Sequence, residues 1–313
     1  MLSLGRKLMA TLPRTHPIKQ SPLHKLGHHK RLASLLKIEV AQLRGLAKAG
    51  SAAYSEWDED KPNGGTRRIE NPKPRLKRLQ SRLATILSLI DPPAFLSCPV
   101  KGRSYISNAR AHLGSKEFVT LDVKSYFPST TWNRVYWYFN KRLLMPRDTA
   151  WTLASVATID GRLPTGSPLS PIMAYLAHED MWLKVAKLAE DVGCRLTVYM
   201  DDITISGARV PEATVWKIKQ EVHKVGLRLN DKKERRFSDV GVITGVVVTP
   251  DGVRLPKRSH LNLSIARKAA LVVDGEAKLR AMRRVRGLEA QHRQVLAPTD
   301  FTDNLSGSHR GSS

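Results

Sequence analysis

The sequence predicts an α+β fold built around a split βαβ sheet. Short runs of strand-forming residues alternate with amphipathic stretches in the order strand, helix, hairpin, helix, strand. Hydrophobic residues make up 41% of the 313-residue chain, a share typical of a globular protein. This length suits one large domain, or two to three lobes that share cores.

The chain is strongly basic, with 52 Lys and Arg against 28 Asp and Glu and a formal net charge of +24. A folded protein with this charge usually binds phosphates, because an unmatched charge strains the compact state. A merely basic surface is the simpler alternative. The first acid is Glu39, and this acid-poor start indicates a nucleic-acid-binding arm, with an organelle transit peptide as the alternative.

The two cysteines, Cys98 and Cys194, exclude a disulfide framework and a zinc site made of cysteines. They favour a reducing, cytoplasmic setting. No apolar run approaches the ~18 residues that span a membrane, and the N-terminus lacks the apolar stretch of a signal peptide. We therefore expect no membrane partner.

The N-terminal third is predicted to contain an arm, two helices and a hairpin. Scattered prolines and bases over residues 1–28 predict a loosely structured arm. Apolar residues recur every three to four positions over residues 32–46, which predicts one helix that ends near Gly50. Asn-Gly-Gly within the basic stretch 61–80 predicts a hairpin turn, and residues 75–89 have a helical pattern.

The central part of the chain contains the strands of the predicted sheet. Residues 118–122 are a short run of strand formers that ends in Asp122. Residues 195–206 have the pattern of a hairpin with an acidic tip. Helical stretches around 131–158 and 171–190 lie between these strands.

After that hairpin, the pattern predicts a helix, a second strand pair and a basic helix. The first helix begins at Pro211 and ends at Gly226. The strand pair lies within residues 240–256 with Asp-Gly as its turn, and the basic helix covers residues 259–297. A Ser- and Gly-rich tail over residues 301–313 is expected to be disordered.

Asp122, Asp201 and Asp202 are predicted to converge, because the strands that carry them are neighbours in a split βαβ sheet. Adjacent unpaired carboxylates between apolar strands are costly without a cation. Two Mg²⁺ ions about 4 Å apart would offset that cost, lower the pKa of an attacking hydroxyl and stabilise a leaving pyrophosphate. An Asp-rich hairpin turn without a metal is the alternative.

Four motifs in this order resemble those of reverse transcriptases, and the resemblance runs from about Lys61 to Leu296. The motifs are LDVKSYFP at 121–128, LPTGSPLSP at 163–171, YMDD at 199–202 and GLRLNDKKERRF at 226–237. Met200 stands in the variable position of the third motif. The resemblance implies an RNA-directed DNA polymerase with the right-hand fold of fingers, palm and helical thumb.

The implied organisation starts with a basic arm and helix over residues 1–50, followed by fingers over 51–117. A palm is expected over 118–250 and a thumb over 251–300. Within the palm span, a segment around 131–170 is expected to be an insertion that belongs to the fingers.

The resemblance also implies roles for single residues. Asp122, Asp201 and Asp202 are the expected catalytic residues, and they bind two Mg²⁺ ions together with the backbone carbonyl of Val123. The expected nucleotide site combines an aromatic ring that excludes a 2′-hydroxyl, a glycine that allows close backbone approach, and several cations. These residues are Phe127, Gly166, Lys61, Arg67, Arg68 and Lys233, with Lys232 as the alternative to Lys233. A core phenylalanine, a turn glycine and a solvated run of charges are the simpler alternatives.

Two further segments resemble motifs of retron reverse transcriptases, namely NARAH at 108–112 and VITG at 242–245. A helix-end Asn and His and a strand glycine are the simpler alternatives. Residues of these segments and arginines of the thumb are expected to bind RNA. The full set is Asn108, His112, Thr244, Gly245, Arg280, Arg283, Arg284 and Arg286.

The retron resemblance implies an enzyme that copies its own structured noncoding RNA from the 2′-hydroxyl of a guanosine. The implied product is a branched RNA–DNA, multicopy single-stranded DNA. The implied partners are the RNA, the DNA product, dNTPs and an effector protein in bacterial defence against phage. Host RNase H is expected to remove the template, because the chain has no room for such a domain. Another bacterial reverse transcriptase, defence-associated or diversity-generating, and a catalytically idle RNA-binding scaffold are the alternatives.

Overall fold

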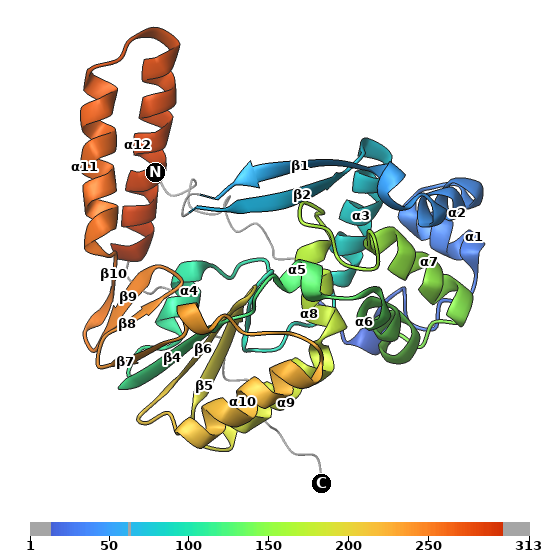
Figure 1. Ribbon diagram of the computed structural model, residues 1–313, viewed down its shortest axis with the longest axis horizontal. Coiled ribbons are helices and arrows are strands. Elements are labelled where there is room, and N and C mark those ends of the chain that lie inside the picture. The colour runs from blue at the N-terminus through green and yellow to red at the C-terminus, as the bar shows by residue number, and fades with distance from the viewer. Residues whose placement is uncertain (1–13, 62–63, 297–313) are drawn as a thin grey trace, which may run out of the picture.

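A five-stranded sheet forms the centre of the computed structural model, which describes residues 14–61 and 64–296 (Figure 1). Its strand order is β3-β5-β6-β4-β7, and only the β3–β5 pair is parallel. The strands are β3 (Leu96–Cys98), β4 (Glu117–Asp122), β5 (Arg195–Tyr199), β6 (Asp202–Gly207) and β7 (Arg235–Ser238). Helices follow β4 and β6 and return the chain to the same sheet, so the predicted α+β fold with a split βαβ sheet is confirmed.

The central strands β5 and β6 are buried along most of their length, as expected for strands covered by other elements. Two helices, α9 (Glu179–Glu190) and α10 (Glu212–Lys224), lie against one face of the sheet in Figure 1. The short helix α4 (Tyr105–Arg110) contacts β3 and β5. The strand ends that carry acidic residues are therefore held in a rigid layer.

A two-stranded hairpin projects above this sheet, and helices pack beside it (Figure 1). Its strands β1 (Tyr54–Asp60) and β2 (Thr66–Pro72) pair in register from Tyr54 with Pro72 to Asp60 with Thr66, which confirms the predicted hairpin. The neighbouring elements are η1 (Ile18–Gln20), α1 (His29–Leu36), α2 (Val40–Lys48), η2 (Gly50–Ala53), α3 (Pro74–Leu87) and α7 (Arg147–Ala157).

Two predictions for the N-terminal part were wrong. The helix predicted over residues 32–46 is two helices, because Lys37 adopts a left-handed conformation (φ 54°) that ends α1. The arm predicted to be loose over residues 1–28 is packed from residue 14 onward, with Leu23 and Leu26 at most 3% exposed. Residues 1–13 lie outside the described residues.

The stretch predicted as helical around residues 131–158 is interrupted in the structure. The stretch predicted around residues 171–190 is interrupted as well, at His178. The helical elements of this part of the chain are short, and each of them buries apolar side chains. They are α5 (Tyr126–Ser129), α6 (Trp132–Trp137), η3 (Tyr138–Arg142), α7 and α8 (Ser170–Ala177). A short turn, η4 (Asp231–Lys233), precedes β7.

The C-terminal part is a small sheet that carries a long helical hairpin, which stands away from the rest in Figure 1. The sheet has three strands where a pair was predicted, β8 (Gly241–Ile243), β9 (Val246–Thr249) and β10 (Gly252–Arg254). The single helix predicted over residues 259–297 is two, α11 (Lys257–Leu271) and α12 (Gly275–Leu296). The chain reverses between them, and their facing sides are joined by the Arg267–Glu289 ion pair (2.8 Å) and by the rings of His260 and His292, whose centroids are 4.7 Å apart.

Among the residues that the structure describes, none of the helices is both long and apolar enough to cross a membrane. The tail predicted to be disordered over residues 301–313 lies outside the described residues. The predicted limits of arm, fingers, palm and thumb stay predictions.

Candidate active site

Three aspartates meet where β4 and the β5–β6 hairpin end. The register of the antiparallel β4–β6 pair sets Asp122 directly opposite Asp202. Asp201 lies at the hairpin tip beside Met200, whose backbone is in the left-handed region (φ 60°). The N–H of Val123 donates to the carbonyl of Asp201 (2.8 Å), which ties the two chain segments together. The predicted convergence of the strands that carry these carboxylates is present in the fold.

The charges of these carboxylates are only partly balanced. Burial, the charge of Asp201 and the charge of Asp122 together raise the pKa of Asp202 to about 6, although Asp202 keeps one side open to solvent. Burial and the charge of Asp122 also raise the pKa of Asp201. Lys233 opposes this, since its Nζ donates to Oδ2 of Asp122 at 2.6 Å. One ammonium group thus faces three carboxylates.

The donor chemistry of the three aspartates fits a divalent cation such as Mg²⁺, which prefers carboxylate oxygens. A bound cation would also relieve the mutual repulsion that raises the pKa of Asp202. In the described part of the chain, no three His, Cys, Asp or Glu side chains already surround one point closely enough to hold a metal ion. The two predicted Mg²⁺ ions and the predicted Val123 carbonyl ligand therefore stay predictions.

Three residues that were predicted separately to touch a nucleotide line one cavity of about 370 Å³. They are Arg67 from β2, Phe127 from α5 and Gly166 from the loop before α8. The remaining lining residues are Ile69, Lys77, Thr165, Ser167 and Pro168. The structure therefore joins segments that are up to 99 positions apart into one concave site.

The other predicted cations of the nucleotide site have different surroundings. Arg68 points to the acidic strand β1, where its guanidinium pairs with Glu56 (3.1 Å) and Asp58 (3.6 Å). Lys61 is exposed at the end of β1 and does not line the cavity. Arg67 pairs with Glu59 at 2.9 Å, but both side chains are about half exposed, and such surface pairs bind weakly. Arg67 is therefore free to rearrange toward an anion.

The residues that hold the loop wall of this cavity were not predicted from the sequence. Glu70 is 1% exposed and accepts the N–H of Thr165 through Oε2 (2.9 Å), while its Oε1 pairs with Arg162 (2.6 Å). Gly166 has φ 129°, and a Cβ there would lie 3.0 Å from the carbonyl oxygen of Glu70. Glycine is therefore required both by conformation and by close approach to β2.

A family model described as "Reverse transcriptase (RNA-dependent DNA polymerase)" matches residues 59–261. This span includes all three aspartates and the whole nucleotide cavity. The chain belongs to the reverse transcriptase family. The predicted right-hand polymerase fold is thereby confirmed as well.

The relatives of this reverse transcriptase include several retron enzymes. The retron Mx162 reverse transcriptase of Myxococcus xanthus is 28% identical over 91% of this chain and 66% of that protein. The retron Se72 reverse transcriptase of Salmonella heidelberg is 29% identical over 56% and 47%, and the retron Ec86 reverse transcriptase of Escherichia coli is 26% identical over 73% and 73%. The chain spans less than two thirds of the length of the first two. The predicted resemblance to retron reverse transcriptases is confirmed.

The two retron-like segments of this reverse transcriptase come together in space. Asn108 Nδ2 donates to Thr244 Oγ1 (3.4 Å), and that hydroxyl donates to the carbonyl of Tyr105 (2.9 Å). Thr244 and Gly245 both have positive φ, 46° and 79°, and form the tight turn between β8 and β9. This turn is partly exposed, whereas Asn108 is 1% exposed.

His112 lies in the interior of the sheet rather than on its surface. The residue is fully buried, with Nδ1 2.6 Å from Ser206 Oγ and Nε2 2.7 Å from Thr197 Oγ1. Burial, followed by the charge of Arg195, lowers the pKa of His112 to about 3. The RNA contact expected of this side chain does not fit these surroundings, because neither ring nitrogen reaches the surface. We assign His112 to holding β5 and β6.

The arginines predicted on the thumb are exposed on α12, a helix that stands away from the five-stranded sheet in Figure 1. Arg280, Arg283 and Arg284 are three and four positions apart, so they share one face of the helix. Arg280 also pairs with Glu276 at 3.0 Å, and Arg286 is set off from this face. Their predicted contact with RNA stays a prediction.

Proposed function

We propose that the protein is an Mg²⁺-dependent RNA-directed DNA polymerase whose catalytic residues are Asp122, Asp201 and Asp202. The direct pairing of Asp122 with Asp202 in the β4–β6 register is the observation that carries this proposal, because it brings carboxylates from distant motifs together. Membership of the reverse transcriptase family supports it. The raised pKa values of two of these acids, Asp201 and Asp202, favour an enzyme over an idle scaffold, which has no need of them.

The side chains of the cavity and of the aspartate site have different roles in nucleotide addition. In the cavity, Arg67 and Lys77 supply positive charge for the triphosphate, Gly166 allows the backbone to approach, and Phe127 forms the wall for the sugar. Lys233 holds the Asp122 carboxylate in place before substrate binds, and we assign it, rather than Lys232, to the site. Two Mg²⁺ ions bound by the aspartates and the Val123 carbonyl would supply hydroxyl activation and charge stabilisation.

Replacing Asp201 with Asn should abolish dNTP incorporation on a primed RNA template while RNA affinity is retained. The metal site needs the carboxylate charge, whereas RNA affinity comes from lysines and arginines elsewhere. Primer extension and filter binding measure the two properties. Asp191→Asn is the matched control, since Asp191 lies beyond the end of α9 and forms an ion pair with Lys187, away from the three aspartates. Polymerase activity that persists in Asp201→Asn contradicts the assignment.

We further propose that this polymerase acts in a retron of a bacterium, in the cytoplasm. It would copy its own noncoding RNA from a guanosine 2′-hydroxyl, make multicopy single-stranded DNA, and act with an effector protein against phage after host RNase H removes the template. Similarity to several retron reverse transcriptases supports this proposal. The chemistry needs no additional catalytic residue, because a 2′-hydroxyl attacks the α-phosphate by the same route as a 3′-hydroxyl.

Expression of the gene with its flanking DNA should yield DNA joined to RNA by a 2′–5′ branch. Treating the extracted nucleic acid with a debranching enzyme should split it into RNA and a DNA strand with a free 5′-phosphate. The same preparation from the Asp201→Asn variant is the control and should contain no such DNA. DNA joined only through a 3′-hydroxyl, or never joined to RNA, would leave a bacterial reverse transcriptase of another kind.

A further inference from the structure

Phe127 stands on a single helical turn that cannot hold its own position. This turn, α5, has only four residues and follows Ser125, which has φ 50° and gives no capping hydrogen bond. A helix this short has no stability of its own in water. The place of the Phe127 ring in the nucleotide cavity therefore depends on side chains that reach the turn from other elements.

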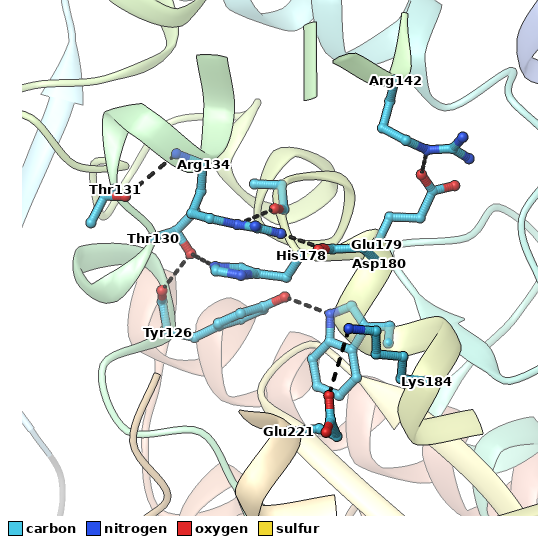
Figure 2. A network of polar contacts seen from close by, with 12 residues as sticks. Tyr126, Thr130, Thr131, Arg134, Arg142, His178, Glu179, Asp180, Lys184 and Glu221 are labelled. Carbon is cyan, nitrogen blue, oxygen red and sulfur yellow. Dashed lines mark hydrogen bonds and ion pairs between the residues drawn. The ribbon is translucent and has the colours of Figure 1, made fainter. Parts of the chain in front are cut away.

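The first support is Tyr126, the residue just before Phe127. Its ring is stacked beside the Phe127 ring, with centroids 6.2 Å apart and planes at 28°. Its hydroxyl accepts a hydrogen bond from the indole Nε1 of Trp182 at 3.1 Å, as the dashed line from Tyr126 in Figure 2 shows. Trp182 belongs to α9 and is fully buried, with its ring edge-on to Tyr126. This contact anchors the start of the turn to the sheet-covering helix.

The second support acts at the end of the turn. Thr130 Oγ1 donates to the carbonyl of Tyr126 (2.9 Å), and the same oxygen lies 3.3 Å from Nε2 of His178 (Figure 2). Because the hydroxyl hydrogen is committed to that carbonyl, His178 must donate, which places its proton on Nε2. Burial lowers the pKa of His178 to about 3, so the ring is neutral and its single proton lies on Nε2.

These contacts form one buried cluster, here called the Tyr126 network, which consists of Tyr126, Thr130, His178 and Trp182. We propose that the Tyr126 network positions Phe127 and thereby sets the discrimination between deoxyribonucleotides and ribonucleotides. The inference rests on the proposed polymerase function and on the predicted contact of Phe127 with the sugar. The two substrates differ by one hydroxyl group, so a small displacement of the ring is enough to admit the larger one.

The direct test is Tyr126→Phe, which removes one hydroxyl and leaves the ring. The full-length chain is assayed on a primed RNA template, and kcat/KM is measured for a dNTP and the matching rNTP. The ratio of the two values should fall about tenfold, the size of effect that a sub-ångström displacement produces at a reacting centre. Tyr138→Phe is the matched control, because Tyr138 is also fully buried but its hydroxyl has no hydrogen-bond partner in the described part of the chain. Its ratio should equal that of the wild type.

A second variant, Trp182→Phe, removes the donor of the same hydrogen bond and covers the case in which Tyr126→Phe fails to fold. The two changes should be non-additive in the double variant, since each breaks the same bond.

Phe127→Val is run alongside and should lower the ratio further. An unchanged ratio in Tyr126→Phe and Trp182→Phe, with a lowered one in Phe127→Val, overturns this inference alone. An unchanged ratio in Phe127→Val overturns the sugar contact and the inference with it. A wild-type chain that incorporates no dNTP overturns the proposed function and everything that depends on it.

Discussion

The environment of His112 decides what this side chain can do. Both ring nitrogens meet hydroxyl groups of neighbouring strands, and the ring is fully buried. A neutral imidazole satisfies both partners, because a hydroxyl can act as donor or acceptor. A protonated ring would carry an unbalanced charge into the sheet interior.

The free energy of unfolding should therefore decrease as the pH is lowered, because His112 takes up a proton more readily in the unfolded chain. Burial places its folded pKa at about 3, below the value of about 6.5 in an unfolded chain, so the unfolded state takes up the proton first. The stabilisation is complete above about pH 6.5 and is lost as the pH falls toward 3, at up to about 1.4 kcal/mol per pH unit. Denaturant unfolding of wild type and His112→Gln between about pH 4.5 and 7.5 should show that the variant loses this share of the slope.

His28→Gln provides the comparison for this measurement, because His28 is exposed before α1. The control should keep the wild-type slope. A His112→Gln chain with the wild-type slope would mean that the ring is not held neutral in the folded protein. His178 is buried with a similarly lowered pKa and stays in place in both variants, so it does not affect the comparison.

Among larger elements, the joint between the β1–β2 hairpin and the loop before α8 shapes the nucleotide cavity. Glu70 links them twice, through the main chain (its N–H to Thr165 O, 2.7 Å) and through its carboxylate. Gln80 on α3 adds a third link, because its Oε1 accepts the hydroxyl of Ser167 in the loop (2.7 Å) and its Nε2 donates to the hydroxyl of Tyr54 in β1 (2.9 Å). These buried polar contacts tie the two cavity walls to each other.

Replacing Glu70 with Ala should loosen this joint. The change leaves the Thr165 N–H without its acceptor and Arg162, whose side chain is 33% exposed, without its ion pair. We expect a loss of about 2 kcal/mol in the free energy of unfolding, the usual effect of leaving a buried polar group unsatisfied. The KM for dNTPs should rise about tenfold as the wall shifts. Urea unfolding and steady-state primer extension measure both effects. Glu190→Ala, at the exposed end of α9, should change neither, and a Glu70→Ala chain that matches it would refute the joint.

For the molecule as a whole, the net charge of +24 is expected to govern the proposed binding of nucleic acid. RNA affinity should fall steeply with salt, because each neutralised phosphate releases a counterion. Replacing Arg283 and Arg284 together with Ala should flatten the slope of log affinity against log salt by roughly one to two units. Fluorescence anisotropy over a salt series gives the slope.

The control for this experiment replaces Lys184 and Lys217 with Ala. These lysines are exposed on α9 and α10, the helices that lie against one face of the five-stranded sheet. Removing these two cations changes the net charge equally but should leave the slope at its wild-type value. Equal flattening in both double variants would show that the total charge matters and that the face of α12 does not.

The order of the main elements and the chemistry of the three aspartates could be predicted from the amino-acid sequence alone. Both features depend on short stretches of sequence. Apolar periodicity distinguishes strands from helices. Asp122, Asp201 and Asp202 lie at the ends of strands that are neighbours in a split βαβ sheet. Arg67, Phe127 and Gly166 were also predictable, because short motifs carry them, and the structure joins them in one cavity.

The points where helices break, the polar groups that are buried and the hydrogen-bond or ion-pair partners of those groups follow from packing in three dimensions. The predicted helix over residues 32–46 splits at Lys37 because both halves must bury leucines, a demand that local periodicity does not contain. His112 is an interior residue, and Glu70 fastens a loop 95 positions away, because packing against distant segments sets burial and partners. Such contacts depend on which faces of distant elements pack together, and the spacing of residues along the chain does not predict this packing.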